Sequence, residues 1–251
     1  GTYEVYAFAS GITSQKVQVN VNHAAINHLE LAPNASKITA DDSQAFTTYA
    51  VDEYDNKWVL DDLLGVQYRI IETEDMGSWS NSVYTPMVAG TWTVEAKYSG
   101  LTTTTTLTVT HGKAAQLLFA DPTNIHLSNA DQIQQYRVYA LDQKGNLWCA
   151  SEYDGGVTFS TTDPAGKFIT NVYYAGKVGT WEIIAKLGDL SIKTNVTVDN
   201  PGVAESIIVS NPPEKIETNN NYQFNIKLYD KNGNEITGRL YTWKITDGAD
   251  L

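Results

Sequence analysis

Apolar and polar residues alternate along most of this chain, and long stretches with helical periodicity are missing. One alternating segment recurs three times, as Phe46–Ala50, Tyr136–Ala140 and Phe224–Leu228. Period-2 patterning with β-branched and aromatic residues is typical of strands. Short strands of this kind, separated by turn residues at roughly 8–12-residue spacing, predict an all-β sandwich.

A second pattern, Gly-Thr-aromatic-x-Val/Ile-x-Ala or a close variant, begins at Gly1, Gly90 and Gly179, a spacing of 89 residues both times. A fixed period of this size predicts an array of similar domains. This motif lies late in each repeat. A chain that begins with the motif is therefore expected to lack the N-terminal strands of its first domain. The predicted parts are an N-terminal segment of closing strands (1–22), repeat 1 (23–110), repeat 2 (111–199) and a C-terminal segment of opening strands (200–251). The aromatic residues Trp92 and Trp181 are predicted to be core residues.

A third pattern, Asp-x-x-x-Asn, follows the alternating segment each time, at Asp52–Asn56, Asp142–Asn146 and Asp230–Asn234. Asp and Asn bond their own local backbone and tolerate left-handed conformations, and Gly supplies positive φ. With an apolar strand on each side, the pattern predicts a hairpin turn. Equivalent core positions after the turn are predicted for Trp58, Trp148 and Ile236.

The linkers between the predicted domains are short and lack the Gly/Ser composition of flexible tethers, so we expect restricted bending between domains. His23 and His111 fall at equivalent linker positions. Two interpretations stay open for them: structural linker residues, or ligands and pH-sensitive contacts between domains.

These hairpin, late-strand and linker patterns resemble the tandem Ig-like repeats of prokaryotic surface proteins, both S-layer proteins and invasin/intimin-type adhesin stalks. The resemblance covers essentially the whole chain. It implies tandem Ig-like Greek-key β-sandwiches in a beads-on-a-rod array, at an extracellular location on the cell surface. Such repeats are mostly spacers, and a fold does not dictate a function.

The chain carries a net charge of -12, which argues against nucleic acid as a partner, because nucleic-acid binding needs a basic patch. The single cysteine, Cys149, excludes an intrachain disulfide framework. No apolar run approaches the ~18 residues of a membrane span, so we expect no direct membrane insertion by this segment. No constellation of catalytic residues is visible, and we expect no enzymatic activity.

Calcium is the one cofactor that the sequence suggests, because oxygen-rich acidic clusters suit this ion. The candidate ligands are Asp52, Asp55, Asp61 and Asp62. Asp55 is replaced by Gly145 and Gly233 in the other copies of the hairpin, so the cluster does not repeat. The alternative interpretation is that these carboxylates are turn residues on a solvated acidic face.

Two sequons, at Asn34 and Asn195, allow N-glycosylation in a secreted chain. By strand alternation Asn195 is expected to point outward. Trp79, in a predicted polar loop over residues 77–81, is a candidate for binding a partner or a sugar. The alternative is that Trp79 folds back over the end of the sandwich.

Two classes of function compete on this basis. The first is a structural repeat segment that builds a cell-surface coat or filament, with copies of itself or neighbouring surface proteins as partners. The second is a spacer stalk that presents the binding tip of an adhesin. An accessory module of a secreted enzyme is a third hypothesis, because the fold alone does not exclude it.

Overall fold

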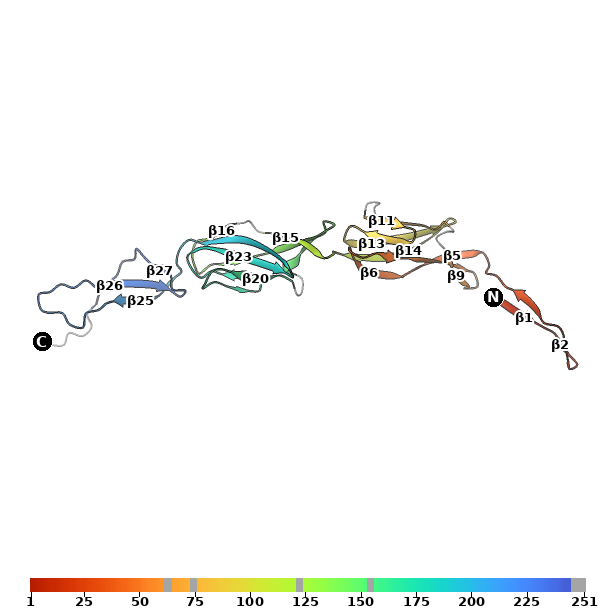
Figure 1. Cartoon of the computed structure of the whole chain (residues 1–251), viewed down its shortest axis with the longest axis horizontal. Coiled ribbons are helices and arrows are strands. Elements are labelled where there is room, and N and C mark those ends of the chain that lie inside the picture. The colour runs from red at the N-terminus through yellow and green to blue at the C-terminus, as the bar shows by residue number, and fades with distance from the viewer. Residues whose placement is uncertain (61–64, 73–75, 121–123, 153–155, 245–251) are drawn as a thin grey trace. The chain divides into compact units, whose positions relative to one another are not determined.

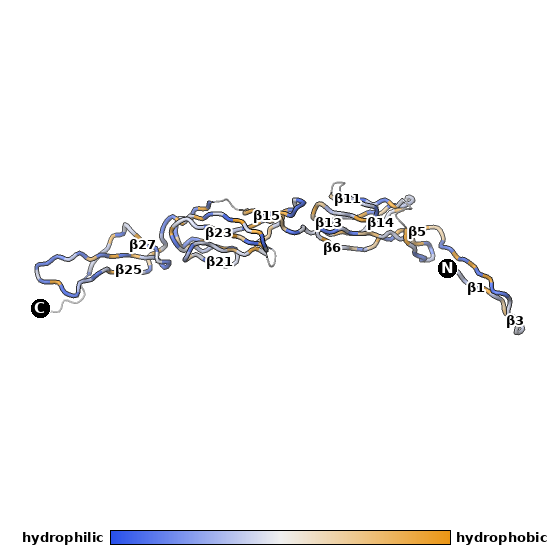
Figure 2. The backbone as a smooth tube through the Cα atoms, in the orientation of Figure 1, coloured by the Kyte–Doolittle hydropathy of each residue, from blue (hydrophilic) through white to orange (hydrophobic). Residues whose placement is uncertain are grey.

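The computed structural model describes residues 1–60, 65–72, 76–120, 124–152 and 156–244 (Figure 1). The chain divides into two units. Unit 1 comprises Gly1–Lys113 and the hairpin turn Asp142–Asn146, and unit 2 comprises Ala114–Leu141 and Leu147–Leu251. Nearly all regular structure is β, as the alternation predicts, and Figure 2 shows hydrophobic and hydrophilic residues interleaved along the strands.

The N-terminal segment of unit 1 is an antiparallel hairpin. β1 (Thr2–Val5) pairs with β4 (Val17–Asn20), and β2 (Phe8–Ala9) pairs with β3 (Ile12–Thr13). Every residue of these strands is exposed. The hairpin thus has the pairing of closing strands without a sheet packed against it.

Repeat 1 is built from three sheets. The first joins β5 (Ile26–Ala32), β8 (Thr47–Asp52) and β9 (Lys57–Leu60). The second has the order β10 (Gln67–Ile70), β13 (Gly90–Tyr98), β14 (Leu101–Thr110) and β6 (Ala35–Thr39), with β14 and β6 parallel. The third joins β11 (Gly77–Ser80), β12 (Val83–Pro86) and β7 (Gln44–Ala45).

Repeat 2, most of which belongs to unit 2, follows the same plan. Its first sheet joins β15 (Ala114–Phe119), β18 (Val138–Asp142) and β19 (Leu147–Cys149), after which a 3-10 helix, η2, covers Ala150–Glu152. The second sheet has the order β16 (Ile125–Leu127), β24 (Leu190–Val198), β23 (Gly179–Leu187) and β20 (Thr158–Thr161). The third joins β17 (Ile133–Gln135), β22 (Val172–Tyr174) and β21 (Lys167–Ile169).

Among its described residues, the C-terminal segment of unit 2 repeats the first sheet alone, with β25 (Ala204–Ser210), β26 (Asn225–Asp230) and β27 (Glu235–Ile236). The strand registers confirm the alignment of the three hairpins: Trp58 faces Ala50, Trp148 faces Ala140, and Ile236 faces Leu228 across the ladder. The sequence pattern therefore located the same strand pair in each copy.

Each repeat has its core between the long hairpin of the second sheet and the other strands. Val94, Leu107 and Val109 are at most 2% exposed in repeat 1, and their counterparts Ile183, Val196 and Val198 are equally buried in repeat 2. The predicted core position of Trp92 and Trp181 needs a correction, since both indoles are only half-buried and pack at the margin of the cores. At that margin each indole N–H reaches a backbone carbonyl of the preceding loop.

Candidate functional site: the joint between repeats

The Asp-x-x-x-Asn turn folds around its own aspartate. In the C-terminal segment, Asp230 Oδ1 accepts the backbone N–H groups of Asn232 and Asn234 at 2.9 and 2.8 Å. The Asn234 side chain donates to Asp230 Oδ2 at 2.7 Å. The turn around Asp52 in unit 1 repeats these bonds, so the local turn chemistry predicted from the sequence is confirmed.

The same aspartate also holds the linker that enters its repeat. The second carboxylate oxygen accepts a backbone N–H from Ala24, Gly112 or Gly202 in the three copies, at 2.8, 2.7 and 2.8 Å. The three aspartates are 0%, 5% and 3% exposed. A buried carboxylate with three or more N–H donors is fully satisfied, which makes this turn a fixed anchor for the chain entering each repeat.

The protonation of these aspartates follows from the same bonds. Burial raises the pKa of Asp52, but the N–H donors of Ala24, Asn56 and Tyr54 outweigh burial and lower the pKa to about 2. Asp142 and Asp230 shift in the same direction: burial raises the pKa of each, and the following Asn side chain and the linker N–H lower it by more. All three are therefore carboxylates at neutral pH.

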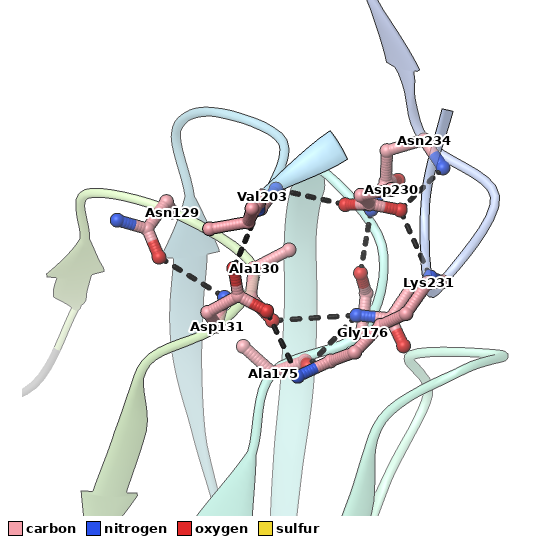
Figure 3. A network of polar contacts seen from close by, with 11 residues as sticks. Asn129, Ala130, Asp131, Ala175, Gly176, Val203, Asp230, Lys231 and Asn234 are labelled. Carbon is pink, nitrogen blue, oxygen red and sulfur yellow. Dashed lines mark hydrogen bonds and ion pairs between the residues drawn. The ribbon is translucent and has the colours of Figure 1, made fainter. Parts of the chain in front are cut away.

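The turn of the C-terminal segment docks on the end of repeat 2 through its asparagine (Figure 3). Asn234 Nδ2 donates to the carbonyl oxygen of Gly176 at 2.8 Å. Asn234 Oδ1 accepts the backbone N–H of Val178 at 3.0 Å. Asn234 is 7% exposed. One side-chain amide thus forms hydrogen bonds with both a backbone C=O and a backbone N–H of the loop that precedes β23. A neighbouring strand would form the same two kinds of bond.

A second contact at this joint is centred on Asp131 of repeat 2, which Figure 3 also shows. Its Oδ2 accepts the backbone N–H of Val203 at 2.6 Å, and its Oδ1 pairs with Lys231 Nζ at 2.8 Å. The hydrogen bond from Lys231 is the main reason that the pKa of Asp131 lies below its usual value. A Cβ at Gly202 would lie 2.5 Å from this carboxylate, so a larger residue would force the linker or the Asp131 side chain to shift.

In unit 1, the turn Asp142–Asn146 makes the matching bonds to the end of repeat 1. Asn146 Nδ2 donates to Met87 O at 3.1 Å, and Asn146 Oδ1 accepts the N–H of Ala89 at 2.8 Å. Asp41 takes the place of Asp131 and accepts the N–H of Lys113 at 2.6 Å. Two joints therefore use one hydrogen-bonding scheme.

The third residue of the turn differs between the joints but performs the same task. Lys144 donates through Nζ to two backbone carbonyls, those of Ala40 and Pro86. Asn232 donates through Nδ2 to the carbonyls of Ala130 and Ala175, at 3.3 and 3.5 Å. Both side chains insert a donor between two carbonyl groups at the end of a repeat. A polar donor is the shared requirement at this position.

In repeat 2 the loop that receives Asn234 is also held from inside the domain. Asp163, 4% exposed, accepts the N–H groups of Gly176 and Lys177 at 2.8 and 3.0 Å and the hydroxyl of Tyr173 at 2.7 Å. Burial and the adjacent carboxylate together raise the pKa of Tyr173, which therefore stays a neutral donor. The loop is thus fixed between a buried core tyrosine and the following segment.

The candidate calcium ligands receive different surroundings. Asp52 is occupied by N–H donors, and Asp55 is exposed with a φ of 60° in the left-handed region. Asp61 and Asp62 lie outside the described residues. Among the residues that the structure describes, no group of three or more His, Cys, Asp or Glu is arranged to hold a metal ion. Calcium binding stays a prediction.

The other predicted residues are placed as follows. Asn34 and Asn195 are both exposed, Asn195 on β24. The loop predicted around Trp79 is wrong, because this residue lies in strand β11 and pairs with Tyr84 of β12. Trp79 is half-buried and its ring packs on Tyr84 and Tyr68 with centroid distances of 4.9 and 5.3 Å, so much of its surface is used inside repeat 1. Glycosylation and binding at these sites stay predictions. His23 stacks on Trp58 at 3.6 Å, a structural contact at the linker.

Sequence reasoning interpreted the Asp-x-x-x-Asn pattern as a local turn and missed its contact with the preceding repeat. It also assigned no contact at the end of a repeat to Asp41, Asp131 or Asp163. The asparagine at the fifth position gave no separate signal of this contact, because it also bonds the aspartate of its own turn in all three copies.

Comparison with known proteins gives likeness of fold. No family model matches the chain, and no curated protein matches it. Among solved structures, domains 1–6 of the surface layer protein SbsC are 19% identical, with 94% of this chain and 36% of that chain covered and a TM-score of 0.31. Invasin, a bacterial integrin-binding protein, is 17% identical, with 84% and 48% covered and a TM-score of 0.47. Three Ig domains of titin are 10% identical, with 77% and 72% covered and a TM-score of 0.37.

The chain thus spans less than half the length of the SbsC and invasin structures. The sequence motifs implied tandem all-β repeats, and repeats 1 and 2 share one plan of three sheets. Within the described part of the chain, no helix is both long enough and apolar enough to cross a lipid bilayer.

Proposed function

We propose that this chain is a structural repeat segment of an extracellular prokaryotic surface protein and that it forms part of a cell-surface coat or filament. The observation that carries the proposal is the joint, which occurs twice with one bonding scheme. Each joint places an asparagine on the end of the preceding repeat; Asn234 is buried and Asn146 is half-buried. Hydrogen bonds that recur at each joint favour restricted bending between neighbouring domains, which an ordered assembly requires.

The charge of the chain supports the same proposal. A net charge of -12 keeps an isolated molecule soluble, and carboxylates on neighbouring molecules can be bridged by divalent cations when the molecules form a layer. The partners in this proposal are copies of the chain or neighbouring surface proteins, and calcium is the bridging ion. No reaction is assigned to the chain.

A second function uses the same joint. In a spacer stalk of an adhesin, restricted joints hold a binding tip away from the cell, and lateral contacts between molecules are not needed. An accessory module of a secreted enzyme would need only a spacing role from these domains.

Electron microscopy of the native cell envelope, with and without a calcium chelator, tests the proposal. A regular layer or filament that dissolves on chelation supports a cation-bridged coat. Isolated thin projections that are unchanged by the chelator would overturn the coat and favour the stalk. A matched magnesium-supplemented sample separates a specific calcium requirement from general charge screening.

A further inference from the structure

The two repeated motifs meet at a single peptide group. In repeat 2, the indole Nε1–H of Trp181 donates to the carbonyl oxygen of Lys177 at 2.7 Å. The N–H of Val178, the other half of the same peptide group, donates to Asn234 Oδ1 at 3.0 Å. The tryptophan of one repeat and the asparagine of the next segment therefore hold one amide plane from its two ends.

Unit 1 contains the same arrangement. Trp92 Nε1–H donates to Val88 O at 3.2 Å, and the N–H of Ala89 donates to Asn146 Oδ1 at 2.8 Å. The second occurrence has different loop residues, Val88 and Ala89 in place of Lys177 and Val178. The shared element is thus the pair of side chains and not the loop sequence.

The glycine of the Gly-Thr-Trp motif allows this geometry. A Cβ at Gly90 would lie 2.4 Å from the indole of Trp92. Gly179 has a φ of 138°, and a Cβ there would approach the Trp181 indole to 3.1 Å. The indole lies over the glycine so that its N–H reaches back four residues to the loop carbonyl. A Cβ at Gly90 would force the Trp92 ring to shift, and at Gly179 the positive φ strains any other residue.

We propose that the Gly-Thr-Trp motif and the Asp-x-x-x-Asn turn are energetically coupled through this peptide group. The tryptophan orients the loop peptide, and the asparagine of the following repeat then docks on it. A peptide group that accepts a hydrogen bond at its carbonyl becomes a stronger donor at its N–H. Docking of the asparagine in turn fixes the loop on which the tryptophan rests. Each repeat therefore stabilises the end of the one before it, whether the parent protein is a coat or a stalk.

The first copy of the turn supplies an internal control. Asn56 makes the same bonds to Asp52 as Asn234 makes to Asp230, but no other hydrogen bond of its side chain is seen among the described residues. It is exposed, whereas Asn234 is 7% exposed. Asn56→Ala therefore removes only the bonds inside the turn, and Asn234→Ala removes those and the docking bonds.

The test is amide hydrogen exchange of Val178 in the full chain, measured by NMR for Trp181→Phe, Asn234→Ala and the double variant. We expect Asn234→Ala to speed exchange at Val178 at least tenfold, Trp181→Phe to speed it severalfold, and the double variant to fall well short of the product of the two. Trp181→Phe keeps an aromatic ring and removes the N–H donor. Asn56→Ala is expected to leave Val178 unchanged.

Trp92→Phe and Asn146→Ala form the equivalent double-mutant cycle in unit 1, measured by exchange at the amide of Ala89. This cycle replaces the first one if a unit 2 variant fails to fold. Trp92→Phe combined with Asn234→Ala is the control pair, because the two residues belong to different joints. The factors by which these two substitutions change the amide exchange rates should multiply. Effects that multiply equally for the same-joint pair would overturn the coupling, because independent groups show no interaction term. No change at Val178 in Asn234→Ala would overturn the docking itself.

Discussion

Asp163 is the residue whose loss should most weaken the end of repeat 2. Asp163→Ala removes the acceptor for the Tyr173 hydroxyl and for the N–H groups of Gly176 and Lys177. Tyr173 is 0% exposed and Gly176 is also buried, so water cannot replace the carboxylate at these two donors. Each buried donor left without an acceptor costs about 1–3 kcal/mol, which predicts a loss of about 2–6 kcal/mol in the unfolding free energy of repeat 2.

The assay for this prediction is urea unfolding followed by hydrogen exchange at core amides of β22–β24, because a chain of several repeats does not unfold in one step. Tyr173→Phe in the Asp163→Ala background is the control. It removes one orphaned donor and should return part of the lost stability. A loss below about 1 kcal/mol for Asp163→Ala would refute the reasoning, since that is the effect of a surface position.

Three further outcomes follow from the structure. Because the pKa of Asp52 is lowered from 3.8 to about 2 in the folded chain, its stabilising contribution should be complete above about pH 4 and disappear as the pH falls toward 2; thermal unfolding across this range, compared with Asp52→Asn, checks it. Leu107→Ala, at 0% exposure, should cost about 3–5 kcal/mol in denaturant unfolding, whereas Leu147→Ala, at 57% exposure, should cost less than about 0.5 kcal/mol. Gly202→Ala should speed amide exchange at Val203, because its Cβ would lie 2.5 Å from the Asp131 carboxylate, and unchanged exchange would show that the linker has room.

The strands were predictable because their signals are local. Alternation with β-branched residues marks one buried face, and the registers of Trp58 and Trp148 on their partner strands agree with that pattern. The turns were predictable for the same reason, since Asp52 bonds residues two and four positions ahead. The fold class could therefore be derived without any knowledge of long-range contacts.

The joint could not be derived in this way. Its bonds connect residues far apart in the chain, such as Asn234 with Val178, and their partners are backbone atoms that leave no mark on the sequence. Trp181 was placed in the core because large aromatic residues favour burial, but its indole N–H needs an acceptor and sits where the loop supplies one. The recurrence of the aromatic residue at one strand position was predicted correctly, but its full burial in the core was wrong.

The receiving side of the joint consists largely of main-chain atoms: Asn146 and Asn234 bind carbonyl and amide groups that every amino acid other than proline offers. A repeat can therefore diverge widely in its loop side chains and still accept its neighbour. Duplication, deletion or exchange of whole repeats would leave each new junction with a matching pair of surfaces. The array can change in length during evolution without the invention of a new interface at each step.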